Sequence, residues 1–355
     1  MKTELNPWKR YVTVIFVGAP IALFAVLCII TAVDPYKVLP WSVMQKPPIV
    51  SDVQRYVFPM LLRTRSYDSF IFGSSTGMLV DPQAMDKIFG GRFANLAMTD
   101  GKAWEQLDVL HLAIRQTPTI RTLIFTFDWV WCVESMAKFQ REIDRFPSWM
   151  YDDPKWSNLF RMISESVLKL SIDEIRGQVH DLPSKIRDDG YFVFTPPEQT
   201  YDFERARKFI YGYVGPMLRD EIARARHAPA VPISDELRAT WRFPALEVLE
   251  RELASLPDSV KVMIIGMPVH IATQPLPGSV IAARELACKL KADAIAKRHS
   301  GAFIDFRIAS AVTDNDANYW DALHYRLSTA RKLDEAIGTA VRSGKSDPDG
   351  FWKIY

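Results

Sequence analysis

The chain of 355 residues is poor in cysteine and in net charge. Its three cysteines include no Cys-x-x-Cys and no Cys/His ligand spacing, so we expect no structural zinc, and no motif points to another metal or to a cofactor. The formal net charge is +2, with acidic and basic residues mixed along the sequence, so there is no basic patch for nucleic acid. Internal repeats and low-complexity tracts are absent. The 48% of hydrophobic residues and 24% of charged residues are typical of one large globular domain with additions.

One long apolar run stands near the N-terminus, from Tyr11 to Val33, and carries no charged residue. A helix needs about 20 such residues to cross a bilayer core. A cleaved signal peptide has a shorter apolar region of roughly 7 to 15 residues before a small-x-small site, whereas this run ends at Asp34. The bulky Leu27 before Cys28 argues against a lipoprotein signal. We therefore predict a retained transmembrane helix, with a kink at Pro20.

The basic residues near the run set its expected orientation. Three precede it and three follow it, so the charge bias is slight (Lys2, Lys9, Arg10; Lys37, Lys46, Arg55). Because Lys9 and Arg10 adjoin the span directly, we expect a cytoplasmic N-terminus and a single pass through a bacterial inner membrane, with the soluble domain in the periplasm. The two remaining cysteines, Cys132 and Cys288, could pair in such an oxidising compartment. The favoured interpretation is two separate buried thiols.

The rest of the chain alternates short apolar runs with helix-like stretches. The runs are strand-length: residues 69–72, 93–97, 122–127, 260–265 and 302–306. This pattern predicts an α/β fold with about five parallel strands between helices, a three-layer α/β/α arrangement. The predicted boundaries are a cytoplasmic leader at 1–10, the span at 11–33, an extended linker at 34–66, the α/β domain at 67–345 with an insertion at 134–258, and a tail at 346–355.

Two motifs indicate serine-based acyl chemistry. The first strand ends at Gly73-Ser74-Ser75-Thr76-Gly77, where the glycine allows a tight turn and the second serine is better placed to project its hydroxyl. Near the other end stands Asp321-Ala322-Leu323-His324, which supplies an orienting carboxylate and a base on one loop. We predict Ser75 as nucleophile, His324 as base and Asp321 as the acid. Taken alone, the pentad is also typical of an ordinary polar turn.

His270 follows the fourth predicted strand, at the edge of the sheet where the site is expected. It is a candidate pocket residue, with a loop histidine bonded to the backbone as the alternative. Four tryptophans are candidates for stacking on sugar rings, although core packing is the commoner role of such residues (Trp129, Trp131, Trp149, Trp156).

Several blocks of the sequence resemble the SGNH (GDSL-like) hydrolase superfamily, whose fold is flavodoxin-like. More narrowly, the chain resembles the membrane-anchored bacterial branch of that superfamily, which includes proteins that handle acyl groups on cell-envelope polysaccharides. The resemblance rests on Gly73-Ser74-Ser75, on the stretch from Asn95 to Gly101, on Pro268-Val269-His270 and on the residues from Tyr319 to Tyr325. It implies that the N–H groups of Ser75 and Gly101 form the oxyanion hole. Where the family places an asparagine as third donor, this chain has Asp128, which cannot donate unless protonated. Ser74 and Asp128 are further candidate pocket residues.

The pentad also matches the G-x-S-x-G elbow of α/β-hydrolases, but Ser75 follows the first strand of its domain and the acid and base share one loop. The expected function is thus a membrane-anchored serine esterase or O-acyltransferase that acts on acyl groups, above all acetyl, of a cell-envelope or extracellular polysaccharide. The alternative is a catalytically weak accessory or scaffold subunit. In that case the N-terminal helix, which contacts membrane lipid in either case, also packs against an integral-membrane partner protein.

Overall fold

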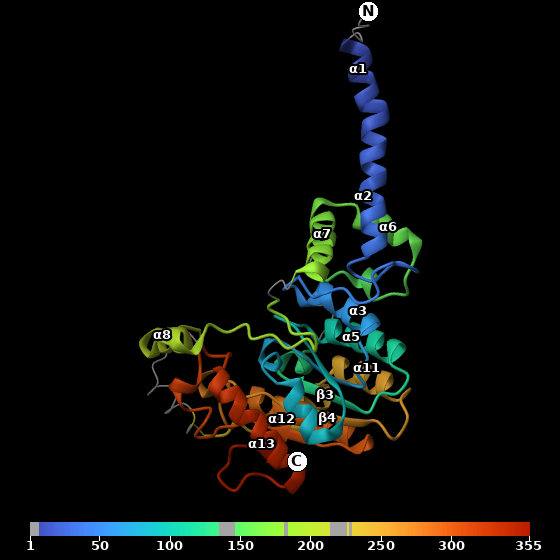
Figure 1. Ribbon diagram of the computed structural model, residues 1–355. Coiled ribbons are helices and arrows are strands. Elements are labelled where there is room, and N and C mark those ends of the chain that lie inside the picture. Colours follow the sequence, from blue (N-terminus) through green and yellow to red (C-terminus); the bar gives the residue numbers. More distant parts are fainter. Residues whose placement is uncertain (1–6, 135–145, 181–183, 214–225, 227–228) are drawn as a thin grey trace, which may run out of the picture. The chain divides into compact units, whose positions relative to one another are not determined.

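The computed structural model describes residues 7–134, 146–180, 184–213, 226 and 229–355, and element labels follow Figure 1. The chain forms two compact units. One comprises Met1–Arg65 with Pro147–Ile186, and the other comprises Ser66–Phe146 with Arg187–Tyr355. Part of the predicted insertion therefore belongs to the same unit as the predicted span.

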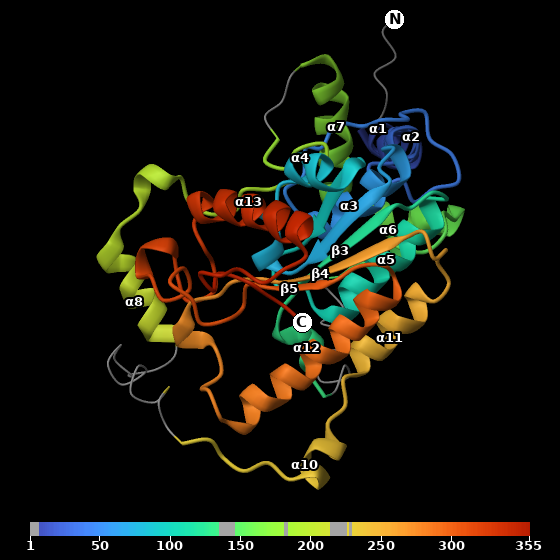
Figure 2. The ribbon, with the colours of Figure 1, turned by 90° about the horizontal axis from the view of Figure 1, so that it is seen from below.

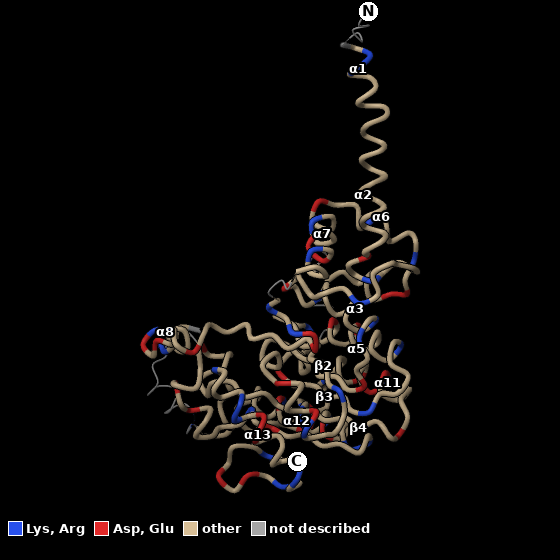
Figure 3. The backbone as a smooth tube through the Cα atoms, in the orientation of Figure 1, with Lys and Arg blue, Asp and Glu red and all other residues tan. Residues whose placement is uncertain are grey.

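The first unit begins with a long apolar helix made of α1 (Pro7–Thr13), a π-helical turn (Val14–Gly18) and α2 (Ala19–Val33). The segment Trp8–Val33 is long and apolar enough to cross a membrane, and α2 carries no charged residue (Figure 3). In the π-helical turn the Ala19 N–H donates to the Val14 carbonyl oxygen, five residues earlier. Pro20 follows directly, and since it has no N–H to continue the regular pattern, the irregular turn lies where the sequence predicts a kink.

The segment after the helix is more structured than the extended linker predicted for residues 34–66. The Asp34 carboxylate accepts hydrogen bonds from the Val38 and Leu39 N–H groups (3.1 and 2.9 Å) and holds the turn that ends α2. The short helix α3 (Gln54–Thr64) buries Phe58 and Leu61. The same unit contains α6 (Leu159–Met162) and α7 (Glu165–Val179), and α7 packs on α2. Apolar faces on these short helices account for the compact unit.

The second unit contains a six-stranded sheet in the order β2-β1-β3-β4-β5-β6. The strands are β1 (Ser69–Gly73), β2 (Phe93–Ala97), β3 (Thr122–Phe127), β4 (Lys261–Gly266), β5 (Phe303–Asp305) and β6 (Lys353–Ile354). The first five pair in parallel, as the sequence predicts. The sixth strand, β6, pairs antiparallel with β5 and lies in the segment predicted as a tail. A strand of two residues is too short to show a periodic apolar pattern in the sequence.

Helices lie on both sides of these strands. Figure 2 shows α4 (Pro82–Met85) and α13 (Leu327–Ser343) on one side, and α5 (Ala103–Gln116), α11 (Pro244–Leu253) and α12 (Val280–Arg298) on the other. Two further helices, α8 (Phe203–Tyr213) and α10 (Asp235–Thr240), come from the predicted insertion. The strands are buried almost throughout, so their continuous apolar sequences are those of parallel strands covered on both faces.

The sulfur atoms of Cys132 and Cys288 form a disulfide, with the two Cα atoms 5.7 Å apart. The bond joins the 3₁₀ turn Trp129–Cys132, just after β3, to α12. The favoured prediction of two separate thiols is therefore wrong. Cysteine spacing does not reveal whether two distant side chains meet in the folded state.

Candidate active site

The nucleophile candidate Ser75 opens a 3₁₀ turn, Ser75–Gly77, directly after β1. The glycines on either side are required by the close approach of β3. A Cβ on Gly73 would lie 1.7 Å from the Thr126 hydroxyl oxygen, and a Cβ on Gly77 would lie 2.1 Å from it. That hydroxyl donates to the Phe72 carbonyl oxygen at 3.0 Å. The serine is thus held at the carboxyl end of β1 by close packing against the neighbouring strand.

The structure brings Ser75, His324 and Asp321 together. The Ser75 Oγ lies 2.9 Å from His324 Nε2, although the two residues are 249 positions apart. His324 Nδ1 lies 2.8 Å from Asp321 Oδ2. With Nδ1–H donating to the carboxylate, Nε2 is free to accept the serine proton, which is the arrangement of a serine nucleophile with its base.

Asp321 is arranged to stay ionised. Burial opposes its charge, but the His324 ring and the N–H groups of Leu323 and His324, which donate to Oδ1 at 2.8 and 2.9 Å, outweigh burial and hold the pKa of this carboxyl below its usual value. The Asp321 side chain is 37% exposed and that of His324 is 25% exposed. Both groups are therefore partly open to solvent, and the edge of the Phe194 ring contacts the imidazole.

Ser74 and Asp128 interact with each other. The Ser74 hydroxyl donates to Asp128 Oδ2, while Asp128 Oδ1 accepts the Val130 N–H at 3.0 Å. Both side chains are buried. Burial raises the pKa of Asp128 above its usual value, although the Ser74 hydrogen bond opposes this shift. The pair therefore links the Ser75–Gly77 turn to the turn after β3.

Gly101 lies against the end of β1, since a Cβ there would be 2.9 Å from the Gly73 carbonyl oxygen. Its N–H donates to the Met98 carbonyl oxygen at 3.1 Å. The assignment of the Ser75 and Gly101 N–H groups to an oxyanion hole stays a prediction. Asn95 supports the Ser75–Gly77 turn, because its amide nitrogen donates to the carbonyl oxygens of Gly77 and Val80 (3.0 and 2.9 Å).

His270 is 1% exposed. Its Nδ1 accepts the Ala272 N–H at 3.2 Å, and its Nε2 lies 3.0 Å from Asp316 Oδ1. The rings of Tyr211 and Tyr319 pack edge to face against it. Both ring nitrogens of His270 thus interact within the protein. This agrees with the alternative of a loop histidine bonded to the backbone better than with a pocket residue.

A pocket of about 270 Å³ lies beside Asp321. Trp320 and Asp321 form one part of its wall, and the rest comes from the insertion (Pro196, Thr200, Asp202, Arg205, Ala206, Phe209). Sequence analysis did not identify these insertion residues. The available signal was Trp320, which directly precedes the Asp-x-x-His block.

A second pocket, of about 400 Å³, is lined by Trp129, Trp241 and Cys132, among other residues. Trp129 is 45% exposed, whereas Trp131 is fully buried with its ring against Phe125. Of the four tryptophans predicted to contact sugars, Trp131 is therefore a core residue. Trp149 and Trp156 belong to the first unit, where Arg161 stacks on Trp149 and Trp156 is exposed.

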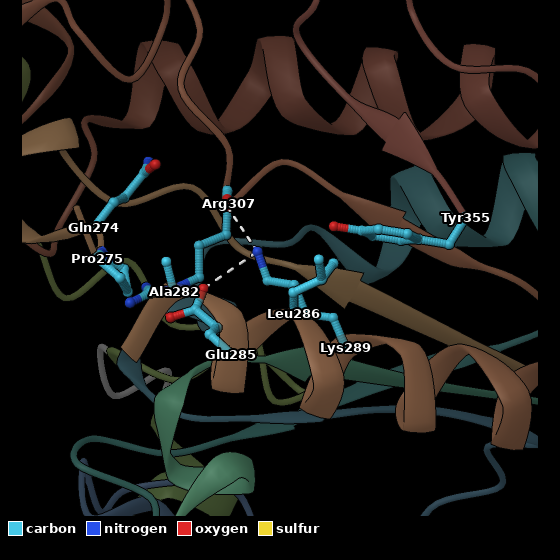
Figure 4. A pocket seen from close by; sticks show the side chains of 8 residues that line it. All are labelled: Gln274, Pro275, Ala282, Glu285, Leu286, Lys289, Arg307 and Tyr355. Carbon is cyan, nitrogen blue, oxygen red and sulfur yellow. Dashed lines mark hydrogen bonds and ion pairs between the residues drawn. The ribbon is translucent and has the colours of Figure 1, made fainter. Parts of the chain in front are cut away.

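A third pocket, of about 130 Å³, is lined by a cluster of charged groups that sequence analysis did not identify (Figure 4). The Lys289 amine lies 2.9 Å from Asp305 Oδ2 and 3.2 Å from Glu285 Oε1, and it donates to the Arg307 carbonyl oxygen at 2.9 Å. The Tyr355 hydroxyl donates to Asp305 Oδ2 at 3.0 Å. Figure 4 shows the lysine pointing toward Glu285 and the Arg307 backbone.

Within the described ranges, no group of three or more His, Cys, Asp or Glu side chains could hold a metal ion. Comparison with known proteins adds no assignment. No protein-family model matches the chain, and no curated protein matches it either. The geometry of Ser75, His324 and Asp321 is therefore the basis for proposing a function.

Proposed function

We propose that this protein is a serine esterase or O-acyltransferase with Ser75 as nucleophile. The observation that carries the proposal is the continuous line of hydrogen bonds from Ser75 Oγ through the His324 ring to Asp321. The position of the serine after the first strand, and of the acid and base on one loop, supports an SGNH-like, three-layer α/β/α arrangement.

In the proposed mechanism, His324 Nε2 takes the proton of Ser75 as Oγ attacks the acyl carbonyl carbon. Asp321 holds the imidazole with its Nδ1–H inward and stabilises the cation that forms. The N–H groups of Ser75 and Gly101 donate to the oxyanion, which requires the Gly101 N–H to leave the Met98 carbonyl. The leaving alcohol takes the proton from His324. Water or a sugar hydroxyl then attacks the acyl-enzyme by the reverse sequence.

The proposed setting is the periplasmic side of a bacterial inner membrane. The apolar helix Trp8–Val33 supports anchoring, and the Cys132–Cys288 disulfide supports an oxidising compartment. A polysaccharide substrate is favoured by the pocket that Trp129 and Trp241 line, because indole faces stack on the apolar faces of sugars. Acetyl is the proposed acyl group.

The test uses the full chain purified in detergent micelles. We expect hydrolysis of p-nitrophenyl acetate and covalent labelling by a fluorophosphonate probe, with mass spectrometry placing the label on Ser75. Ser75→Ala should remove both signals. Ser74→Ala is the matched neighbour, and it should leave the label on Ser75. A probe that labels another residue, or an activity that survives Ser75→Ala, contradicts the proposal.

A second candidate function is an accessory or scaffold subunit with little catalysis. It is favoured by the engaged Gly101 N–H and by Asp128, whose side chain is directed to Ser74 and Val130. Wild type and Ser75→Ala that are equally inert toward acetyl esters, acyl donors and the probe would favour this role.

A further inference from the structure

A segment of the insertion lies against the loop that carries Asp321 and His324. Glu198 opens a 3₁₀ turn, Glu198–Thr200. Its Oε1 accepts the Leu327 N–H at 2.8 Å and the Ser328 N–H at 3.4 Å. Its Oε2 pairs with Arg326, whose Nε lies 3.0 Å away. All three partners follow His324 closely in the sequence.

This carboxylate caps a helix from far away in the chain. Helix α13 begins at Leu327, and its N-cap residue Arg326 makes no capping hydrogen bond through its own side chain. The first N–H groups of a helix need an acceptor, and negative charge is favoured at that end. Glu198 supplies both from 129 residues earlier. The capping contact therefore fixes the start of α13 three residues after His324.

The same segment also holds the loop before Asp321. The Tyr211 hydroxyl donates to Asp316 Oδ1 at 2.9 Å, and the Tyr201 hydroxyl donates to the Asp316 carbonyl oxygen at 3.2 Å. Arg207 Nε lies 3.2 Å from Asp316 Oδ2. The stretch from Asp316 to Leu327 is thus attached to the insertion at both ends.

Aromatic contacts fill the space between these two attachments. The Arg326 guanidinium carbon lies 3.8 Å from the centre of the Tyr201 ring, and the edge of Tyr201 packs on Trp320. The Trp320 backbone N–H donates to the His324 carbonyl oxygen at 2.8 Å. Arg326, Tyr201 and Trp320 thus form a chain of contacts from Glu198 to the backbone of His324.

We infer that Glu198 is a positioning residue, which keeps His324 Nε2 within hydrogen-bond distance of the Ser75 hydroxyl. The inference rests on the proposed function. Without the carboxylate, Arg326 and the first turn of α13 lose their acceptor, and the loop samples orientations in which the imidazole does not reach the serine. A displacement of about 1 Å can lower a rate on the order of 100-fold.

The experiment compares Glu198→Ala, Glu198→Gln and Glu236→Gln in full-length protein in micelles. Glu236 is the matched control, an exposed carboxylate in the first turn of α10 in the same insertion. Measurements are kcat and KM for p-nitrophenyl acetate, the rate and final extent of Ser75 labelling by the fluorophosphonate, and the unfolding temperature.

For Glu198→Ala we expect kcat and the labelling rate to fall together by about 10- to 100-fold. KM and the final extent of labelling should stay near wild type, because the protein remains folded. Glu198→Gln keeps one oxygen for the Leu327 N–H and should recover part of the rate, and Glu236→Gln should match wild type. A wild-type kcat in Glu198→Ala overturns the inference. So does a lower extent of labelling with an unchanged rate per labelled site, which would show a purely structural role.

A proton NMR measurement separates this inference from the proposed function. The His324 Nδ1–H that donates to Asp321 should give a low-field resonance, which Asp321→Asn identifies by removing it. If wild type neither hydrolyses the ester nor reacts with the probe, the proposed function fails. The positioning of His324 is then judged by this resonance alone. Its loss or broadening in Glu198→Ala, with retention in Glu236→Gln, supports the inference, and an unchanged resonance overturns it.

Discussion

Two aspartates in the second unit, Asp321 and Asp305, each interact with a basic side chain, yet their environments differ. Asp321 is partly exposed, receives two backbone N–H groups and has a lowered pKa. Asp305 is fully buried at the end of β5, and burial raises its pKa despite the Lys289 amine and the Tyr355 hydroxyl. The His324 ring and the two backbone N–H groups keep Asp321 charged, so that it can orient the imidazole. Because Asp305 is completely buried, its carboxylate can stay ionised only through its interactions with Lys289 and Tyr355.

The comparison separates catalysis from stability. Removing the charge of Asp321 should leave the protein folded and impair the chemistry of His324. Removing the partner of Asp305 should leave an uncompensated buried charge and impair folding instead. The following predictions test this division, starting from the largest expected effect.

Asp321→Asn should lower kcat on the order of 10⁴-fold, equal to about 5 kcal/mol, because the amide no longer holds the imidazole in the required tautomer. The check is steady-state hydrolysis of p-nitrophenyl acetate together with urea unfolding. Glu236→Gln, an exposed carboxylate in α10, is the control and should retain activity. An Asp321→Asn variant with near wild-type kcat would remove the catalytic half of the comparison.

Lys289→Met should lower the free energy of unfolding by about 3 to 5 kcal/mol, because it leaves the fully buried Asp305 without its cation, whereas Glu285 keeps its ion pair with Arg307. The measurement is urea unfolding, with fluorophosphonate labelling of the folded fraction expected at the wild-type rate. Lys289→Met with Asp305→Asn should recover part of the stability. Equal loss in the single and double variants would show that the charge of Asp305 is not the cause.

Cys132→Ser with Cys288→Ser should lower the free energy of unfolding by about 2 to 4 kcal/mol, since the bond restricts the unfolded chain across a separation of 156 residues. Urea unfolding with and without a thiol reductant measures the effect. The reductant should change the wild type and leave the double variant unchanged. A wild-type midpoint that is insensitive to complete reduction contradicts the expectation.

The two aspartates should give opposite pH dependences of stability. The pKa of Asp321 is lower in the folded state than in the unfolded chain, where it is about 3.9. The stability that the ionised Asp321 contributes is therefore complete above the unfolded-state pKa and is lost as the pH falls through the folded-state pKa. The pKa of Asp305 is higher in the folded state than in the unfolded chain. The stability that the protonated Asp305 contributes is therefore present below the unfolded-state pKa and is lost as the pH rises through the folded-state pKa. Unfolding curves of Asp321→Asn and Asp305→Asn against wild type from pH 3 to pH 7 measure both slopes. Slopes of the same sign would contradict the assignment.

Asp128→Asn should have the smallest effect, less than about 1 kcal/mol on stability, because burial raises the pKa of Asp128 and an amide resembles the protonated carboxyl. The asparagine oxygen can still accept the Val130 N–H, and its amide can donate to Ser74. Urea unfolding and kcat are the measurements, with Asp128→Ala as the disruptive counterpart. A loss as large as that of the alanine variant would show that the charge itself is required.

Local patterns predicted much of the fold and the central part of the site. The five parallel strands follow from apolar runs of strand length, and the membrane-span prediction follows from an uncharged run, because burial and bilayer thickness act on consecutive residues. Ser75 and the Asp321–His324 pair were identified because a glycine-flanked turn and an Asp-x-x-His spacing are local. The helix α3 was not predicted, because it lies in a segment rich in proline and aromatic residues, a composition typical of a linker.

The sequence by itself determined the strands, the uncharged helix and the chemistry available at each candidate position, since these depend on residues close together in the chain. Only the tertiary structure decided which distant groups meet. The 2.9 Å approach of Ser75 to His324, the Cys132–Cys288 bond, the capping of α13 by Glu198 and the pairing of β6 with β5 all join distant residues. No local periodicity encodes such contacts, because each forms only when packing of the whole unit brings its two sides together.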